Sequence, residues 1–171
     1  MNLRYEKFEE KHIEIYYSWR NDPEVAANDQ AGFLRPMGFE EVKEWSQRMI
    51  DGPTFIAYDG EEPLGTCAFM NLDQRNRHAE LAIVIGNKKY WSKGYGTKIM
   101  EQLLDWGFEG LNLNRLYLHV FSFNERAIGL YEKMGFKHEG TLREMVYRDG
   151  AYHDLLAYGI LKDEYYKNKL K

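Results

Sequence analysis

The chain has 171 residues and a mass of 20.3 kDa, which fits one domain with a sizeable hydrophobic core. A net charge of −4, a pI of about 5.8 and the lack of any Lys/Arg block exclude the usual nucleic-acid-binding composition. Residues 1–52 hold 11 acidic residues against 7 Lys and Arg, so the negative excess lies in the first third of the chain. Cys67 is the single cysteine and the N-terminus lacks an apolar stretch, so we expect a reduced, cytoplasmic protein without a membrane segment.

The spacing of apolar residues predicts strands and helices in the first half of the chain. Asp59-Gly60 lies between two strand-like runs and favours a β-hairpin, because both positions tolerate positive φ. The predicted elements are a strand at 2–8, helices at 12–19 and 39–49, and strands at 54–58 and 64–72.

The second half opens with Ala79–Ile85, which is too continuously apolar to have one wet face and therefore predicts a central strand. The elements predicted after it are a helix at 95–110, a strand at 115–121, a helix at 125–134, and strands at 136–147 and 152–161. Together they predict one α/β domain over residues 1–171. Its core is a mixed, mostly antiparallel sheet of six to seven strands, flanked by about four helices.

A turn with two glycines follows the predicted central strand, in the run Lys93-Gly94-Tyr95-Gly96-Thr97. Amides at the start of a helix and the positive end of its dipole suit a pyrophosphate, and lysines at 88, 89, 93 and 98 flank the turn. A turn that only relieves backbone strain would give the same pattern. A Walker loop is excluded because Lys93 precedes Gly94 rather than following it, and a dinucleotide fingerprint because position 99 is Ile99.

Two segments resemble signatures of the GNAT acetyltransferase superfamily, particularly the branch of ribosomal-protein and spermidine N-acetyltransferases. Residues 90–97, Tyr-Trp-Ser-Lys-Gly-Tyr-Gly-Thr, are similar to that family's acetyl-CoA pyrophosphate loop. Residues 124–136, from Asn124 to Phe136, are similar to its second signature. Trp91 stands where Gln or Arg is frequent, but backbone amides carry the contact. The resemblance implies a single GNAT-like domain.

The resemblance also implies an activity, namely transfer of the acetyl group of acetyl-CoA to a primary amine by direct attack in a ternary complex. It implies that Asn124 bonds the pantetheine arm and that the Tyr131 hydroxyl protonates the departing thiolate. A core tyrosine on a helix is the alternative for Tyr131. The backbone positions implied to bind the co-substrate are Ile83, Val84 and Ile85 along the pantetheine, and Lys93, Gly94, Tyr95, Gly96 and Thr97 at the pyrophosphate.

The acceptor must lose a proton, since an alkyl amine with a pKa near 10.4 is neutral in only about one molecule in 2,500 at pH 7. Glu80 is the candidate base, because it interrupts the apolar central strand. An ion pair with Arg75 or Arg77 is the alternative for Glu80, and ordered water is the alternative route for the proton. An amide near Val84 or Ile85 is a candidate oxyanion donor.

The cysteine and the histidines are the other side chains that could react or bind a metal. Cys67 lies within a strand-like run without a signalled His partner, so packing is expected rather than acyl transfer. The histidines at 12, 78, 119, 138 and 153 show no ligand spacing, so no metal site is predicted. His119 is predicted to be a strand residue.

The acceptor wall in proteins of this resemblance comes from the two N-terminal helices and their loop. Its acids suit a cationic amine, and a polyamine, an aminoglycoside or amino sugar, and a protein N-terminus all stay open. A homodimer is also left open, and neither nucleic acid nor membrane is expected as a partner. The alternative function is a non-catalytic acyl-CoA-binding regulatory module, against which Asn124 and Tyr131 argue. The acids concerned are Asp22, Glu24, Asp29, Glu40, Glu41 and Glu44.

Overall fold

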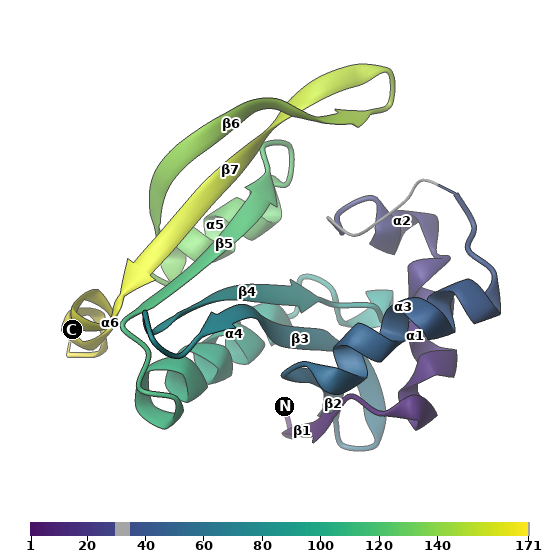
Figure 1. Ribbon diagram of the computed structural model, residues 1–171, viewed down its shortest axis with the longest axis horizontal. Coiled ribbons are helices and arrows are strands. Elements are labelled where there is room, and N and C mark those ends of the chain that lie inside the picture. The colour runs from purple at the N-terminus through teal and green to yellow at the C-terminus, as the bar shows by residue number, and fades with distance from the viewer. Residues whose placement is uncertain (30–34, 171) are drawn as a thin grey trace. The chain divides into compact units, whose positions relative to one another are not determined.

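The sheet is the central feature of the computed structural model, which describes residues 1–29 and 35–170 (Figure 1). Within those residues seven strands follow the order β1-β2-β3-β4-β5-β7-β6. The β4–β5 pair is parallel, whereas the ladders β1–β2, β2–β3, β5–β7 and β6–β7 are antiparallel. The strands are β1 (Leu3–Lys7), β2 (Thr54–Asp59), β3 (Glu62–Asp73), β4 (His78–Val84), β5 (Arg115–Phe121), β6 (Lys137–Arg148) and β7 (Ala151–Leu161). The predicted α/β fold with a mixed, mostly antiparallel sheet is confirmed.

Helices lie between the strands along the chain, and one helix follows the last strand. Six α-helices occur among the described residues, two more than the sequence led us to expect. They are α1 (Ile13–Arg20), α2 (Pro23–Ala26), α3 (Phe39–Asp51), α4 (Tyr95–Asp105), α5 (Glu125–Lys133) and α6 (Lys162–Lys169). Three further helical segments are the 3₁₀ helices η1 (Glu10–His12) and η2 (Lys88–Tyr90) and the π-helix η3 (Trp106–Gly110). No helix in residues 1–29 or 35–170 is long and apolar enough to cross a membrane.

The chain divides into two compact units, and the sequence prediction of one domain over residues 1–171 stays a prediction. The first unit comprises Met1–Met70 and Ala82–Ile99, and the second comprises Asn71–Leu81 and Met100–Lys171. Each unit has its own buried side chains.

The core of the first unit lies around α1. Ile13, Tyr16 and Trp19, spaced three residues apart, form the buried stripe of this helix and join a cluster that includes Phe8 and Ile56. Figure 1 shows α1 beside α3, which adds Val42 to the same cluster. Burial of these apolar faces, at roughly 25 cal/mol per Å², holds the helices in place.

The core of the second unit lies against one face of β5. Leu116, Leu118 and Val120 alternate along this strand and are each at most 3% exposed, so the intervening side chains lie on the opposite face. Figure 1 shows β7 between β5 and β6, with α5 close to β5. Asp149 and Gly150, with φ of 52° and 80°, form the tight turn that joins β6 to β7.

Candidate functional site

The turn before α4 reverses the chain through two residues with positive φ. Ser92 has φ of 58° and Gly94 has φ of 84°, a conformation that glycine adopts without a steric penalty. The helix then begins at Tyr95, so the first amides of α4 have no partner inside the helix. The predicted glycine turn therefore delivers backbone donors and the positive end of a helix dipole to one place.

Trp91 and Tyr95 fix the two ends of this turn. The Trp91 indole Nε1 donates to the Ile85 carbonyl at 2.7 Å, which ties the turn to the residue just after β4. The Tyr95 hydroxyl donates to Asp59 Oδ2 at 2.5 Å, at the end of β2. That carboxylate raises the pKa of Tyr95 to about 12, so the phenol stays protonated. The turn is thus supported by side chains of its own unit.

Two of the four lysines near the turn are engaged elsewhere. Lys88 Nζ lies 2.8 Å from Asp22 Oδ2 and 3.0 Å from Glu24 Oε1, and Lys89 pairs with Glu62. The expectation that the four lysines flank a phosphate site stays a prediction, and these two are held by acidic side chains. Lys93 precedes Gly94 in the turn and Lys98 lies in the first turn of α4, and both are exposed.

A polar cluster surrounds Glu80 in the second unit. The Glu80 side chain is 11% exposed, and its two oxygens have different partners. Oε1 lies 2.7 Å from His119 Nδ1 on β5, and Oε2 accepts from Asn71 Nδ2 at 2.8 Å. Asn71 has φ of 49°, a left-handed conformation that Asn tolerates better than most residues. Neighbours on both sides therefore hold this carboxylate.

Strand register explains why Glu80 and His119 meet. The parallel ladder places Glu80 opposite Tyr117, and His119, two residues later, lies on the same face of β5. The alternative pairing expected from sequence, with Arg75 or Arg77, is not the one found: Arg77 Nε donates to the Asn112 carbonyl at 2.9 Å. His119 is a strand residue as predicted, but its bond to Glu80 was missed.

Asn124 and Tyr131 lie on α5, at its start and near its end. Asn124 is the N-cap of this helix, and its side-chain oxygen accepts from the Ala127 amide at 3.2 Å. Tyr131 is 7% exposed, and its ring centroid lies 5.9 Å from that of Phe136. Burial raises the pKa of Tyr131 to about 12, so its hydroxyl keeps its proton at neutral pH.

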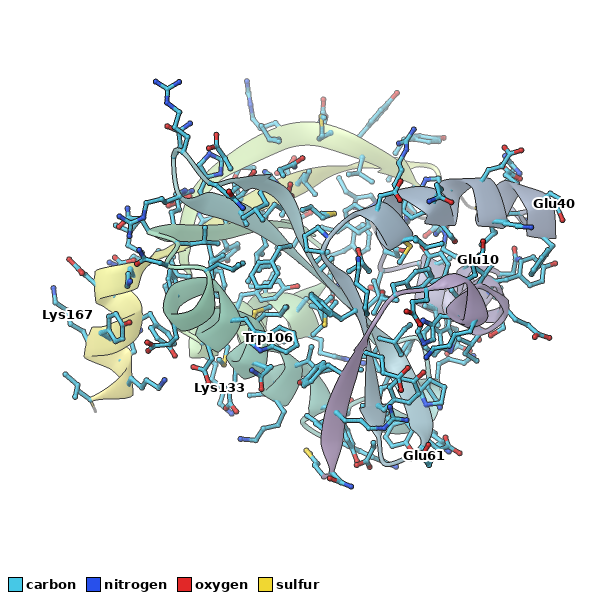
Figure 2. The ribbon with its side chains drawn as sticks, turned by 60° about the horizontal axis from the view of Figure 1, so that its bottom comes forward. Glu10, Glu40, Glu61, Trp106, Lys133 and Lys167 are labelled. Atoms are coloured by element: carbon cyan, nitrogen blue, oxygen red, sulfur yellow. The ribbon has the colours of Figure 1, made fainter. Side chains whose placement is uncertain are left out.

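The acidic residues of the first unit are largely paired with cations. Beyond the Lys88 pairs, Asp29 lies 3.4 Å from the buried Arg20, and Glu41 pairs with Arg35 at 2.6 Å. Glu40 and Glu44 are exposed on α3, and Figure 2 shows Glu40 at the outer end of this helix. Glu40 and Glu44 are thus two acidic side chains of this region that solvent reaches on α3.

No group of three or more His, Cys, Asp or Glu side chains that could hold a metal ion occurs in the described part of the chain. The Glu80 cluster contains one imidazole and one carboxylate. An imidazole and a carboxylate joined by a hydrogen bond are able to exchange a proton.

Comparison with known proteins places the chain in a family. The family model described as Acetyltransferase (GNAT) family matches residues 6–136. The chain is 32% identical over 131 residues to the spermidine N(1)-acetyltransferase of Vibrio cholerae, covering 74% of this chain and 75% of that protein. It is 35% identical over 112 residues to an uncharacterized N-acetyltransferase of Bacillus licheniformis, covering 66% of this chain and 62% of that protein.

A solved structure matches over more of the chain. The spermidine N-acetyltransferase of Vibrio cholerae in complex with CoA and spermine superposes with a TM-score of 0.86 at 26% identity, covering 96% of this chain and 98% of that one. The chain belongs to the GNAT acetyltransferase family. The recognition of this family from the sequence is thereby confirmed, whereas the roles of residues 90–97 and 124–136 stay predictions.

Proposed function

We propose that this chain is an acetyl-CoA-dependent N-acetyltransferase that acts on a primary amine, with residues 1–171 forming one GNAT-type domain. The observation that carries the proposal is the turn before α4, where Ser92 and Gly94 adopt positive φ and the helix amides follow. Such donors, with Lys93 beside them, fit a pyrophosphate. Membership of the family and the CoA complex of the Vibrio cholerae structure support the same co-substrate.

The proposed binding residues follow the chain from β4 to α5. The backbone of Ile83, Val84 and Ile85 would pair with the pantetheine, and Asn124 would bond its amide groups. Because the Ile85 carbonyl already accepts the Trp91 indole N–H, we assign the amide of Ile85 to this contact. The amides that would hold the pyrophosphate are those of Lys93, Gly94, Tyr95, Gly96 and Thr97.

The proposed chemistry is direct attack of the amine, without an acetylated residue on the protein. Tyr131, which stays protonated, would donate to the thiolate as the C–S bond breaks. The Glu80 cluster would remove the proton from the ammonium. Cys67 is an unsuitable nucleophile, because burial raises the pKa of its thiol to about 12 and its side chain is 1% exposed.

We propose a polyamine as the acceptor, in preference to an amino sugar, an aminoglycoside or a protein N-terminus. Spermidine N(1)-acetyltransferases of Vibrio cholerae and Escherichia coli are among the relatives, at 32% and 29% identity. The exposed carboxylates of Glu40 and Glu44 on α3 suit a ligand with more than one positive charge.

Replacing Gly96 with Trp tests the co-substrate site, because a bulky side chain in the turn would block the approach of a pyrophosphate. Calorimetry should show that Gly96→Trp loses acetyl-CoA affinity by about 100-fold or more, whereas Gly110→Trp, where a Cβ meets nothing within 4 Å, retains it. If Gly96→Trp folds and binds acetyl-CoA as tightly as the parent, the turn is not the pyrophosphate site.

A further inference from the structure

His119, which faces Glu80, has an imidazole that could take up a proton. His119 Nδ1 and Glu80 Oε1 lie 2.7 Å apart, within hydrogen-bonding distance. The His119 side chain is 26% exposed against 11% for Glu80, so the imidazole is the more accessible member of the pair. A carboxylate at Nδ1 favours the tautomer with a proton on Nδ1, in which Nε2 is a base.

We infer that His119 is the catalytic base and that Glu80 is a positioning residue, an assignment that rests on the proposed acetyl transfer. In this step the N–H bond of the ammonium breaks and its proton moves to Nε2 of His119. The resulting imidazolium is stabilised by the Glu80 carboxylate at Nδ1. The neutral amine attacks the thioester carbon, and the C–S bond breaks as the thiolate takes the proton of Tyr131. The nitrogen loses its second proton as the amide forms, and one proton returns to the Tyr131 phenolate through solvent. The imidazolium then loses its proton to solvent.

Asn71 is what makes this arrangement specific. Its Nδ2 donates to Glu80 Oε2, so the atom at this position of residue 80 must be a hydrogen-bond acceptor, that is, an oxygen. Only Oε1 is then left for the imidazole, and a carboxylate can only accept there. Asn71 and Glu80 together thus impose the Nδ1–H tautomer on His119.

The groups around the imidazole come from β5 itself and from the strands on either side of it. Glu80 faces it from β4, Tyr117 lies beside it on β5, and β7 places Ala157 opposite His119, while Asn71 on β3 contacts Glu80. Burial, and then the charge of Glu80, raises the pKa of Tyr117, so this phenol stays neutral. Glu80 is therefore the anion that stabilises a protonated His119.

Replacing His119 with Asn tests the assignment, because the Asn amide can still donate to Glu80 but has no atom equivalent to Nε2. We expect His119→Asn to lower kcat/KM for the amine by about 10²- to 10⁴-fold near neutral pH, with acetyl-CoA affinity within about twofold of the parent. Activity should recover at high pH, where free amine becomes plentiful. His138→Asn is the matched control, since His138 lies on β6, hydrogen-bonded to Thr141, and should keep full activity.

Glu80→Gln separates positioning from direct base catalysis. Asn71 requires an oxygen at the Oε2 position, so the amide nitrogen of the introduced glutamine faces Nδ1 and should shift His119 toward the Nε2–H tautomer. Nitrogen-15 chemical shifts of the labelled histidines report this tautomer without any turnover. We expect Nδ1–H in the parent, Nε2–H in Glu80→Gln, and a loss in the double variant no larger than in His119→Asn alone.

The outcomes distinguish this inference from the proposed function. A parent that transfers acetyl to no amine would overturn both. A parent that is active, with His119→Asn folded and within about twofold of it while Glu80→Gln is impaired, would return the base to Glu80. An Nε2–H tautomer in the parent would also overturn the inference, even if His119→Asn failed to fold.

Discussion

At the scale of single residues, burial decides which groups can take part in proton transfer. Tyr131 and Cys67 are both almost fully buried, and burial raises the pKa of each to about 12. For Tyr131 the result is a phenol that keeps its proton and can donate it. For Cys67 the same effect suppresses the thiolate and leaves a packing role. One physical cause thus yields a candidate acid at one position and an inert side chain at the other.

Tyr131→Phe tests the role of the hydroxyl, because it keeps the ring and removes the proton. We expect kcat to fall by about 10²-fold or more, with acetyl-CoA affinity within about twofold of the parent. Tyr165→Phe is the control, since it removes another phenol of the same unit that donates to Asp105. Steady-state kinetics and calorimetry measure both quantities. An unchanged kcat would make Tyr131 a core residue only.

At the scale of elements, the sequence predicted helices and strands that have a regular apolar pattern. It did not predict the short helix α2 or the polar helix α6. The limits of β5 were predicted to the residue, because its apolar alternation is strong. α2 is a single turn, too short for its apolar residues to show a helical period. Asp22 followed by Pro23 is nevertheless a signal for the start of a helix. α6 lacks an apolar stripe and buries only Tyr165.

The Glu80–His119 pair could not be predicted for a different reason. The sequence places each residue on its strand, but the pair depends on the register between β4 and β5 and on the side chain of Asn71. Register between strands that are far apart in sequence follows from tertiary packing, not from local pattern. The sequence therefore singled out Glu80, whose role in proton transfer stays a prediction, and missed its partner His119.

Asp22 links α2 to η2, and this link can be measured. Asp22 Oδ1 accepts from the Glu24 amide at 2.9 Å, and Oδ2 pairs with Lys88. We expect Asp22→Ala to lower the free energy of unfolding by about 1–2 kcal/mol near neutral pH, through loss of the cap and the ion pair. Asp22→Asn keeps a capping oxygen and should cost less than about 1 kcal/mol. Chemical denaturation distinguishes them, and equal losses would contradict the capping role.

The same link has a defined pH dependence. The Lys88 ammonium, together with the backbone amides of Glu24 and Val25, lowers the pKa of Asp22 by more than burial raises it, so the folded-state pKa lies below its usual value. Its stabilisation is therefore complete above the pKa of an unfolded-state Asp and is lost as the pH falls through the lowered folded-state pKa. The stability gap between the parent and Asp22→Ala should shrink on acidification. A gap that grows at low pH would contradict this account.

At the scale of the whole molecule, family membership and charge point to the same class of reaction. The GNAT family model covers residues 6–136, and the acidic excess of the chain lies in residues 1–52. Arg20, Arg35 and Lys88 pair with acids of this region, and Glu40 and Glu44 on α3 are exposed acids that can attract a cation. Location in the cytoplasm stays a prediction.

Release of free CoA in the presence of a panel of amines is the measurement that tests the central claim most directly. The panel contains spermidine, an aminoglycoside, glucosamine and a peptide with a free N-terminus, each at constant acetyl-CoA. We predict amine-dependent release, greatest with spermidine, at a kcat/KM of roughly 10⁴ M⁻¹s⁻¹ or above. A protein that binds acetyl-CoA yet releases no CoA above the buffer rate with any amine would contradict the account and indicate a non-catalytic acyl-CoA-binding module.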